Sequence, residues 1–188
     1  MRKLIVFNHI SLDGYFVDAD GSMAWAKMGN NDPEYNAFVA ENASGDGTLM
    51  FGRVTYELMI KYWPTPMAKQ HDPVVAAGMN NMPKIVFSRT MDKASWNNTT
   101  VLKGDVVSEV KKMKELSGSG IAILGSGTIV SQLAAAGLID EYQVVVNPII
   151  LGKGRTMFEG VKNIVNLKLT KTRSFNSGKV YVCYEPAV

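Results

Sequence analysis

Two glycine-centred junctions hold the residue types in this chain that could bind a charged ligand. Short apolar runs, residues 49–51 and 121–124, end in Gly52 and Gly125, and each leads into a helical pattern. A helix N-terminus presents unpaired N–H groups and a partial positive charge, so it readily accepts phosphate. Two such termini, one of which carries Arg53, suit a ligand with two phosphate sites, such as NADP. The same junctions also occur in α/β proteins that bind nothing there.

Composition places the chain among soluble globular proteins. With 188 residues, 46% hydrophobic and 20% charged, it is expected to form a single domain over residues 1–188. A net charge of +3 is too small to indicate a nucleic-acid partner. The two histidines, His9 and His71, are too few for a metal site, so no metal is expected.

The expected compartment is reducing and cytoplasmic. The single cysteine, Cys183, cannot form an internal disulfide, and its apolar neighbours predict a buried thiol. No segment approaches the ~20 apolar residues that span a bilayer, so no membrane partner is expected. Residues 1–7 have the pattern of a strand rather than of a signal peptide.

Apolar runs and helical patterns predict the elements that position the two junctions. Pro64 and Pro66 indicate a loop with one short helix as far as Pro83, and residues 96–98 read as a turn. Strands that alternate with helices and then stand alone predict an α/β domain with a mixed sheet and an antiparallel edge. The expected strands are 4–7, 49–51, 84–87, 121–124 and 142–146, with a terminal hairpin of 167–175 and 179–184. The expected helices begin at Pro33, capped by Asp32, and cover 54–62, 106–116 (capped by Asp105) and 129–136.

The classical dinucleotide fingerprint is missing from the second junction. Val130 stands where that fingerprint needs glycine or alanine, and no acidic residue follows about 20 positions later. A Walker lysine is also absent from both glycine turns. The junctions therefore belong to another nucleotide-binding arrangement, or to none.

The ordered motifs instead resemble the dihydrofolate reductase superfamily over nearly the whole chain. The first and last of them are more similar to the riboflavin-biosynthesis reductase branch, the C-terminal domain of bifunctional deaminase-reductases. With no room for a deaminase domain, the chain resembles a stand-alone member of that branch. The resemblance implies a three-layer dihydrofolate reductase-like fold whose mixed, mostly parallel sheet ends in an antiparallel C-terminal hairpin. The motifs are Ser11-Leu12-Asp13-Gly14, Met23-Ala24-Trp25, Phe51-Gly52-Arg53-Val54-Thr55-Tyr56-Glu57, Phe87-Ser88-Arg89-Thr90, Leu124-Gly125-Ser126-Gly127-Thr128 and Leu151-Gly152-Lys153-Gly154.

The resemblance implies that NADPH lies along the carboxyl edge of the sheet. Arg53, after Gly52, would then face the 2′-phosphate, and Thr55 would donate to the pyrophosphate. Ser88 and Arg89 match a second loop on the adenosine side. The open alternatives are a solvated arginine, a helix-capping threonine and simple turns. The pyrophosphate would be wrapped by Gly125, Ser126, Gly127 and Thr128, with glycine needed for close approach.

The substrate side also follows from the resemblance. Asp13 would lie beside the nicotinamide pocket and Trp25 near the active site. Glu34, four residues before Phe38, has the spacing of the pterin-binding carboxylate, although a longer segment after Trp25 leaves Asp32 as an alternative. In the purely structural alternative, Asp32 would cap the helix, and Glu34 would be an acidic residue of the first turn that the helix dipole favours.

Val146 stands where dihydrofolate reductases carry a threonine that supports this carboxylate, and its presence counts against folate as the substrate. We therefore expect an NADPH-dependent reductase that transfers hydride to a small pyrimidine, pterin or sugar-derived substrate, with water or Asp13 as proton donor. The alternative is a nucleotide-binding or sensor module without turnover. The protein is expected to form a homodimer through its C-terminal hairpin.

Overall fold

Eight strands form one sheet, in the order β5-β4-β3-β6-β1-β7-β10-β9. The computed structural model describes residues 1–27 and 31–187. Strands β1 and β3 to β7 are parallel, whereas β10 is antiparallel to β7 and β9. The expected mixed, mostly parallel sheet with a C-terminal hairpin is confirmed. The strands are β1 (Leu4–Ser11), β3 (Thr48–Gly52), β4 (Lys84–Phe87), β5 (Thr99–Leu102), β6 (Ile121–Leu124), β7 (Glu141–Asn147), β9 (Leu167–Ser174) and β10 (Val180–Pro186).

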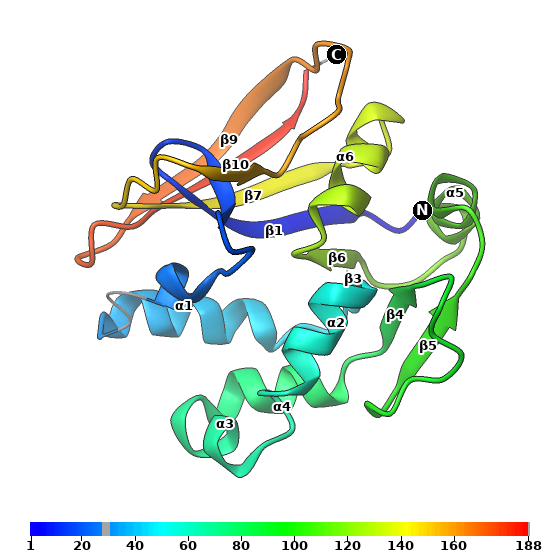
Figure 1. Cartoon of the computed structure of the whole chain (residues 1–188), viewed down its shortest axis with the longest axis horizontal. Helices are drawn as coiled ribbons and strands as arrows, with labels where there is room; N and C mark the ends of the chain where they lie inside the picture. The colour runs from blue at the N-terminus through cyan, green and yellow to red at the C-terminus, as the bar shows by residue number, and fades with distance from the viewer. Residues whose placement is uncertain (28–30, 188) are drawn as a thin grey trace.

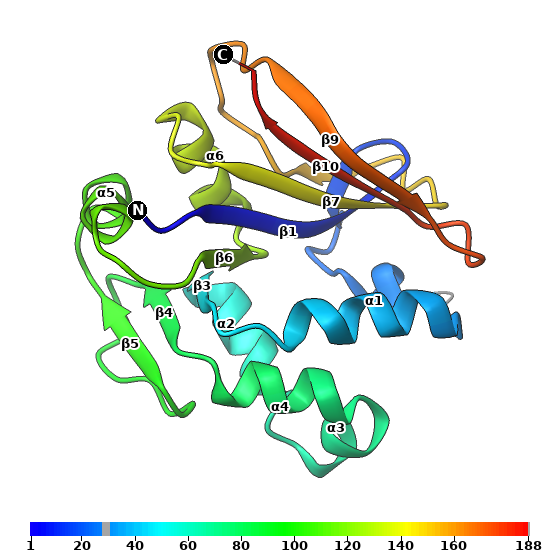
Figure 2. The same cartoon turned by 180° about the vertical axis from the view of Figure 1, so that it is seen from behind.

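Helices cover both faces of the sheet and give three layers. On one face, α5 (Val106–Glu115) and α6 (Gly127–Ala135) bury Val110 and Leu133 against Val6 and Ile123. On the other face lie α1 (Pro33–Ala43), α2 (Arg53–Ile60), α3 (Pro66–His71) and α4 (Pro73–Asn81). Figure 1 shows α6 on one side of the central strands and α1, α3 and α4 on the other. Figure 2 shows the β9-β10 hairpin at the opposite edge from β4 and β5.

The expectation of a loop with one short helix between residues 64 and 83 is wrong. Both α3 and α4 lie there, and Pro66 and Pro73 each occupy the first helical position. Proline fits that position because its missing N–H would have no intrahelical partner. Thr65 caps α3 by accepting a hydrogen bond from the Ala68 N–H. These prolines therefore begin helices instead of interrupting them.

The sequence also left four short elements unpredicted. Strand β5 follows the turn at residues 96–98 and extends the sheet beyond β4. Strands β2 (Tyr15–Asp18) and β8 (Gly154–Thr156) form a separate antiparallel pair, and η1 (Ala24–Lys27) follows β2. Among the described residues, no helix is long and apolar enough to span a bilayer.

Candidate nucleotide and substrate site

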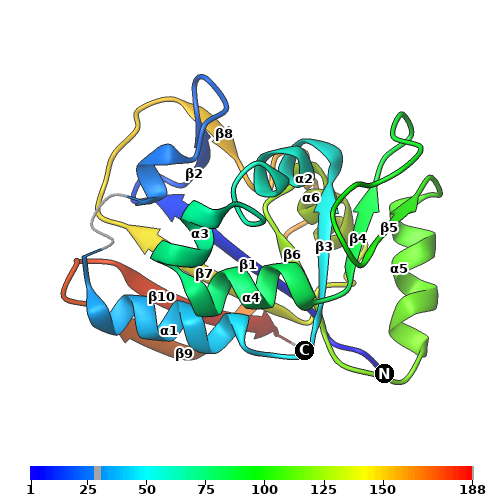
Figure 3. The ribbon, with the colours of Figure 1, turned by 90° about the horizontal axis from the view of Figure 1, so that it is seen from below.

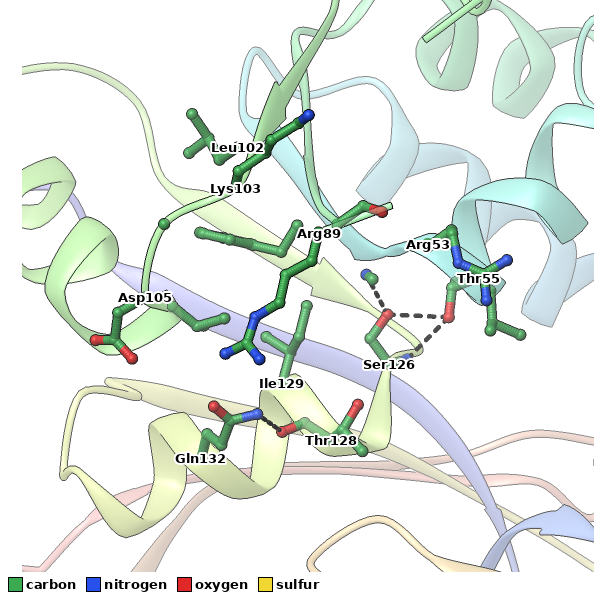
Figure 4. A pocket seen from close by; sticks show the side chains of 16 residues that line it. Arg53, Thr55, Arg89, Leu102, Lys103, Asp105, Ser126, Thr128, Ile129 and Gln132 are labelled. Atoms are coloured by element: carbon green, nitrogen blue, oxygen red, sulfur yellow. Dashed lines mark hydrogen bonds between the residues drawn. The ribbon is translucent and has the colours of Figure 1, made fainter. Parts of the chain in front are cut away.

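A cavity of about 420 Å³ lies where β3, β4, β5 and β6 end. Parallel strands bring their carboxyl ends, and the helix N-termini that follow them, to one edge of a sheet, and ligands of open α/β sheets bind there. The N-terminal residues of α2 and α6 both contribute to its wall (Figure 4). The lining residues are Gly52, Arg53, Val54, Thr55, Phe87, Ser88, Arg89, Leu102, Lys103, Gly104, Asp105, Val106, Ser126, Thr128, Ile129 and Gln132.

The cavity brings together most of the residues that the resemblance assigned to the cofactor. Gly52, Arg53 and Thr55 come from the β3–α2 junction, and Ser88 and Arg89 follow β4. Ser126 and Thr128 line the cavity from the β6–α6 junction, whereas Gly125, which has a positive φ, and Gly127 are not among its lining residues. Lys103, Asp105 and Gln132 were missed. The first two follow β5, a strand that the sequence did not predict.

The two arginines of the cavity differ in their partners. The Arg53 guanidinium donates to both carboxylate oxygens of Glu57, at 2.9 and 3.0 Å. Arg89 has no hydrogen-bond or ion-pair partner among the residues that the structure describes. Figure 4 shows Arg89 extending between Asp105, Ile129 and Gln132, while Arg53 lies at the other end, beside Thr55. Arg89 is thus the described arginine of the cavity that no hydrogen bond or ion pair holds, although its charge interacts electrostatically with the Asp105 carboxylate.

A small hydrogen-bond network joins the two helix N-termini. The Ser126 hydroxyl accepts from the Gly52 N–H at 2.5 Å and donates to Thr55 Oγ1 at 2.9 Å. Thr55 Oγ1 also accepts from the Ser126 N–H at 3.1 Å. Because Thr55 accepts in both contacts, its own hydroxyl proton stays available to a ligand oxygen. The network holds the starts of α2 and α6 together.

The backbone between β6 and α6 explains the need for Gly125. Gly125 and Ser126 both have positive φ, at 65° and 59°. A Cβ at Gly125 would lie 2.7 Å from Thr55 Cγ2, so this glycine avoids contact with the protein itself. A Cβ at Gly127 would meet only Phe16, at an ordinary 3.6 Å. The clash with Thr55 explains why position 125 needs glycine even without a ligand. At position 127 the protein itself leaves space for a Cβ, so only a bound ligand would require glycine there.

Asp13 joins two of the sequence motifs. Its carboxylate accepts from the backbone N–H groups of Leu151, at 3.2 Å, and Gly152, at 2.7 Å. Hydrogen bonds from Ser11 and then from these backbone groups lower the pKa of Asp13. The carboxylate is therefore held ionised, and as an acceptor it fixes the loop after β7. This state disfavours Asp13 as the proton donor.

Trp25 lies in η1 and is buried, with its indole N–H donating to the Ser22 carbonyl at 3.1 Å. The segment between Trp25 and Glu34, whose length left two candidate carboxylates, includes residues 28–30, which lie outside the described residues. The hydrogen bond to Ser22 already occupies the indole N–H of Trp25.

The two candidate carboxylates both have structural partners. Asp32 caps α1 by accepting from the Glu34 and Tyr35 N–H groups, and it also accepts from the Ser177 N–H at 2.7 Å. These bonds, Ser177 first, lower the pKa of Asp32. Glu34 forms an ion pair with Arg173 of β9, at 2.7 Å. Glu34 thus faces the outer edge of the sheet, three strands from β1.

Tyr35, next to Glu34, faces β1, as Phe38 does one turn further along α1. Its hydroxyl lies 3.1 Å from His9 Nε2, and its ring packs edge-on against Phe175. Sequence reasoning did not single out Tyr35. The spacing to Phe38 marks the buried face of the helix, yet it leaves open which strand that face meets.

The interpretation of Val146 is also corrected. Val145 packs with Tyr35 and Phe38 beneath α1, whereas Val146 packs with the core on the opposite face of the sheet. Successive residues of a strand point to opposite faces. Val146 therefore cannot support a carboxylate on α1, and its identity does not bear on folate.

A metal centre does not appear in the part of the chain that the structure describes, where no three His, Cys, Asp or Glu side chains cluster. Cys183 is buried on β10, where burial raises the pKa of its thiol.

Comparisons with known proteins follow the same motifs. Residues 2–181 match the family described as the RibD C-terminal domain. The uncharacterized protein YyaP of Bacillus subtilis (strain 168) is 29% identical over 187 residues, which cover 97% of this chain and 94% of that protein. A putative riboflavin biosynthesis protein from Shewanella sp. PV-4 has a TM-score of 0.73 at 21% identity, with 99% of both chains covered.

Dihydrofolate reductase from Enterococcus faecalis, solved as a complex with NADP(H), has a TM-score of 0.65 at 18% identity. The match covers 99% of this chain and 97% of the reductase. These structures share the three-layer, dihydrofolate reductase-like fold described above. With the family match over nearly its whole length, the chain belongs to the family of RibD C-terminal domains.

Proposed function

We propose that this protein is an NADPH-dependent reductase that acts on a small pyrimidine, pterin or sugar-derived substrate. The observation that carries the proposal is the unpaired Arg89 in a cavity bordered by two helix N-termini. A dinucleotide with a 2′-phosphate offers dianionic groups for both features. The family match and the NADP(H) complex of the related fold support the same choice of cofactor.

The residues of the cavity fit such a ligand. Arg89, with Ser88 beside it, would bind the 2′-phosphate, and Arg53 would join them by exchanging its contact with Glu57. That exchange costs little because both side chains of the Arg53–Glu57 pair are about 45% exposed, and exposed pairs contribute below ~1 kcal/mol. Thr55 and the N–H groups at the start of α6 would bind the pyrophosphate, next to Ser126 and Thr128.

When bound, NADPH supplies the hydride, and the protein supplies orientation and charge placement. The substrate would lie beyond the cofactor, beside β1 and η1, where Asp13 fixes the neighbouring loop. Water is then the proposed proton source, because hydrogen bonds keep Asp13 ionised. Folate is disfavoured because Glu34 pairs with Arg173 at the sheet edge instead of facing β1.

Calorimetry with NADPH and NADH tests the cofactor assignment. Arg89→Ala should weaken NADPH binding about tenfold or more, since a charge-assisted contact is lost, and should leave NADH binding nearly unchanged. Arg155→Ala is the matched control, because Arg155 is an exposed arginine, paired with Glu159, outside the cavity. Equal losses for both cofactors would remove Arg89 from this role.

Turnover separates the reductase from a binding module. NADPH oxidation should be followed with aminopyrimidine, pterin and riboflavin-pathway compounds. Tight NADPH binding without oxidation by any of them would favour a nucleotide-binding or sensor module on the same fold.

A further inference from the structure

Three polar side chains form a hydrogen-bonded row from β7 across β1 to α1. Asn147 Nδ2 lies 3.3 Å from His9 Nδ1, and His9 Nε2 lies 3.1 Å from the Tyr35 hydroxyl. Asn147 is 2% exposed and Tyr35 is 4% exposed. Buried polar groups of this kind are costly unless each has a partner. The hydrogen bonds within the row therefore offset the cost of burying these polar groups.

The backbone fixes the direction of these hydrogen bonds. Asn147 Nδ2 also donates to the carbonyls of Ile10 and Val145, both at 3.1 Å, which sets the orientation of the amide. The two amide hydrogens are shared among these two carbonyls and His9 Nδ1, and Nδ2 cannot accept, so Nδ1 is the acceptor; a neutral His9 then carries its proton on Nε2 and donates to the Tyr35 oxygen. Burial, with the Lys179 charge nearby, lowers the pKa of His9 to about 4 and keeps it neutral.

Two polar atoms of the row have unused hydrogen-bonding capacity. The Tyr35 oxygen accepts from His9, so its own proton is left to donate. The Asn147 Oδ1 atom is buried and has no hydrogen-bond partner in the described part of the chain. An orphaned buried acceptor needs an explanation, and a ligand or water N–H or O–H group supplies one.

His9, the middle residue of the row, lies on the part of β1 that extends beyond β6. Strand β1 pairs with β6 only over Leu4–Phe7, whereas its pairing with β7 continues to Ser11. Residues 8–11 thus extend past the end of β6, next to the Gly125 turn. Asn8 Oδ1 accepts from the Gly125 N–H at 2.6 Å and joins the two segments. His9, the next residue, faces α1. Figure 3 shows α1 and α4 across this face of the sheet.

We propose that the Tyr35 hydroxyl donates a hydrogen bond to the carbonyl oxygen or imine nitrogen of the substrate, with His9 and Asn147 as positioning residues. This inference rests on the proposed reductase function. The substrate class that it selects is a flat heterocycle with a neutral acceptor. Burial raises the pKa of Tyr35, so the phenol stays protonated and acts as a donor throughout the neutral range.

The test compares Tyr35→Phe with Tyr181→Phe. Tyr181 belongs to the same buried aromatic cluster and packs on Phe38, but it lies on β10, away from the row. Each variant keeps the ring and loses one hydroxyl. Calorimetry measures the dissociation constants of NADPH and, for the NADP⁺-loaded protein, of 5-amino-6-(5-phosphoribosylamino)uracil and dihydrofolate.

The expected result is that at least one heterocycle binds about tenfold more weakly to Tyr35→Phe and unchanged to Tyr181→Phe, while NADPH binding stays constant. Unchanged heterocycle binding to Tyr35→Phe, equal losses in both variants, or no binding of either heterocycle to the wild type would overturn the inference. Failure of the wild type to bind NADPH would instead count against the proposed function.

The positioning role has its own readout. The ¹⁵N spectrum of His9 should show the Nε2–H tautomer in the wild type, and Asn147→Leu should remove that preference. An Nδ1–H tautomer in the wild type would overturn the assigned direction of the row.

Discussion

The hydroxyl of Ser126 donates to Thr55 Oγ1 at 2.9 Å and so ties the start of α6 to the start of α2. The two residues are 71 positions apart in sequence. Each belongs to one of the two glycine junctions that the sequence motifs indicate as candidate ligand sites. The atoms that we propose bind a phosphate thus also hold the two junctions in register. We therefore expect NADPH binding and local stability to be coupled at this point.

Thr55→Val should reveal that coupling. Valine keeps the shape of threonine but removes the acceptor of the Ser126 N–H and hydroxyl, so we expect a loss of about 1–2 kcal/mol in the free energy of unfolding. NADPH binding should weaken as well. Urea unfolding and calorimetry measure the two effects. Thr55→Ser retains the hydroxyl and should restore both; a valine variant as stable as the wild type would show that the network contributes nothing.

The two glycines of the second junction should respond differently to alanine. Gly125→Ala combines a left-handed backbone with a clash against Thr55. The backbone alone costs ~1–2 kcal/mol, so with the clash we expect a loss of about 2 kcal/mol or more in the free energy of unfolding. Gly127→Ala adds a methyl group at ordinary contact distance inside a helix and should change stability by less than about 1 kcal/mol. Thermal or urea unfolding of both variants checks the order, and equal losses would contradict it.

The order of strands and helices was largely predictable because both glycine junctions, the terminal hairpin and the helix caps are written in local sequence. Asp105, for example, caps α5 as expected. The errors arose where a distant partner decides the outcome. Pro66 and Pro73 are compatible with a helix start or a loop, and tertiary packing selects the helices: α4 packs against the sheet, and α3 packs against α4. Strand β5 exists because β4 offers it an open edge.

In the candidate site, too, local sequence predicts some features, whereas distant contacts decide others. The cofactor residues gather at one edge because parallel strands end there, which the sequence pattern implies. The Arg53–Glu57 pair has the i,i+4 spacing of helical ion pairs, although the sequence analysis did not predict it. Val146 was misread because a shift of one residue moves a side chain to the other face of a strand. The contact of Tyr35 with His9 depends on how α1 lies across β1 and β7, and no local pattern encodes that.

His9 predicts an acid-sensitive step in stability. Its pKa is about 4 in the folded protein and about 6.5 in the unfolded chain. Between these values the unfolded chain binds a proton that the folded protein does not, so stability falls as the pH drops from 6.5 to 4, by up to about 3 kcal/mol. Urea unfolding at a series of pH values measures this slope.

His9→Gln is the control for this titration. The variant should lose most of the slope between pH 6.5 and 4, whatever its stability at neutral pH. Asp13 and Asp32, whose pKa values are lowered, contribute at lower pH, below their ordinary value of 3.8. A wild-type slope equal to that of the variant would show that His9 is not desolvated as described.

The exposed edge strand β9 predicts a homodimer. All but one of its eight residues are exposed, and Leu169, which is 49% exposed, lies on an edge that no described strand covers. Unpaired strand edges with apolar side chains favour association with a second copy. Light scattering at micromolar concentration should therefore give a dimer mass. Leu169→Glu should give a monomer with the same circular dichroism spectrum, because the side chain is already half exposed within one chain. Leu116→Glu, at another exposed leucine that ends α5, is the matched control and should stay dimeric. A monomeric wild type, or a dimer that survives Leu169→Glu, would place any self-association elsewhere on the surface.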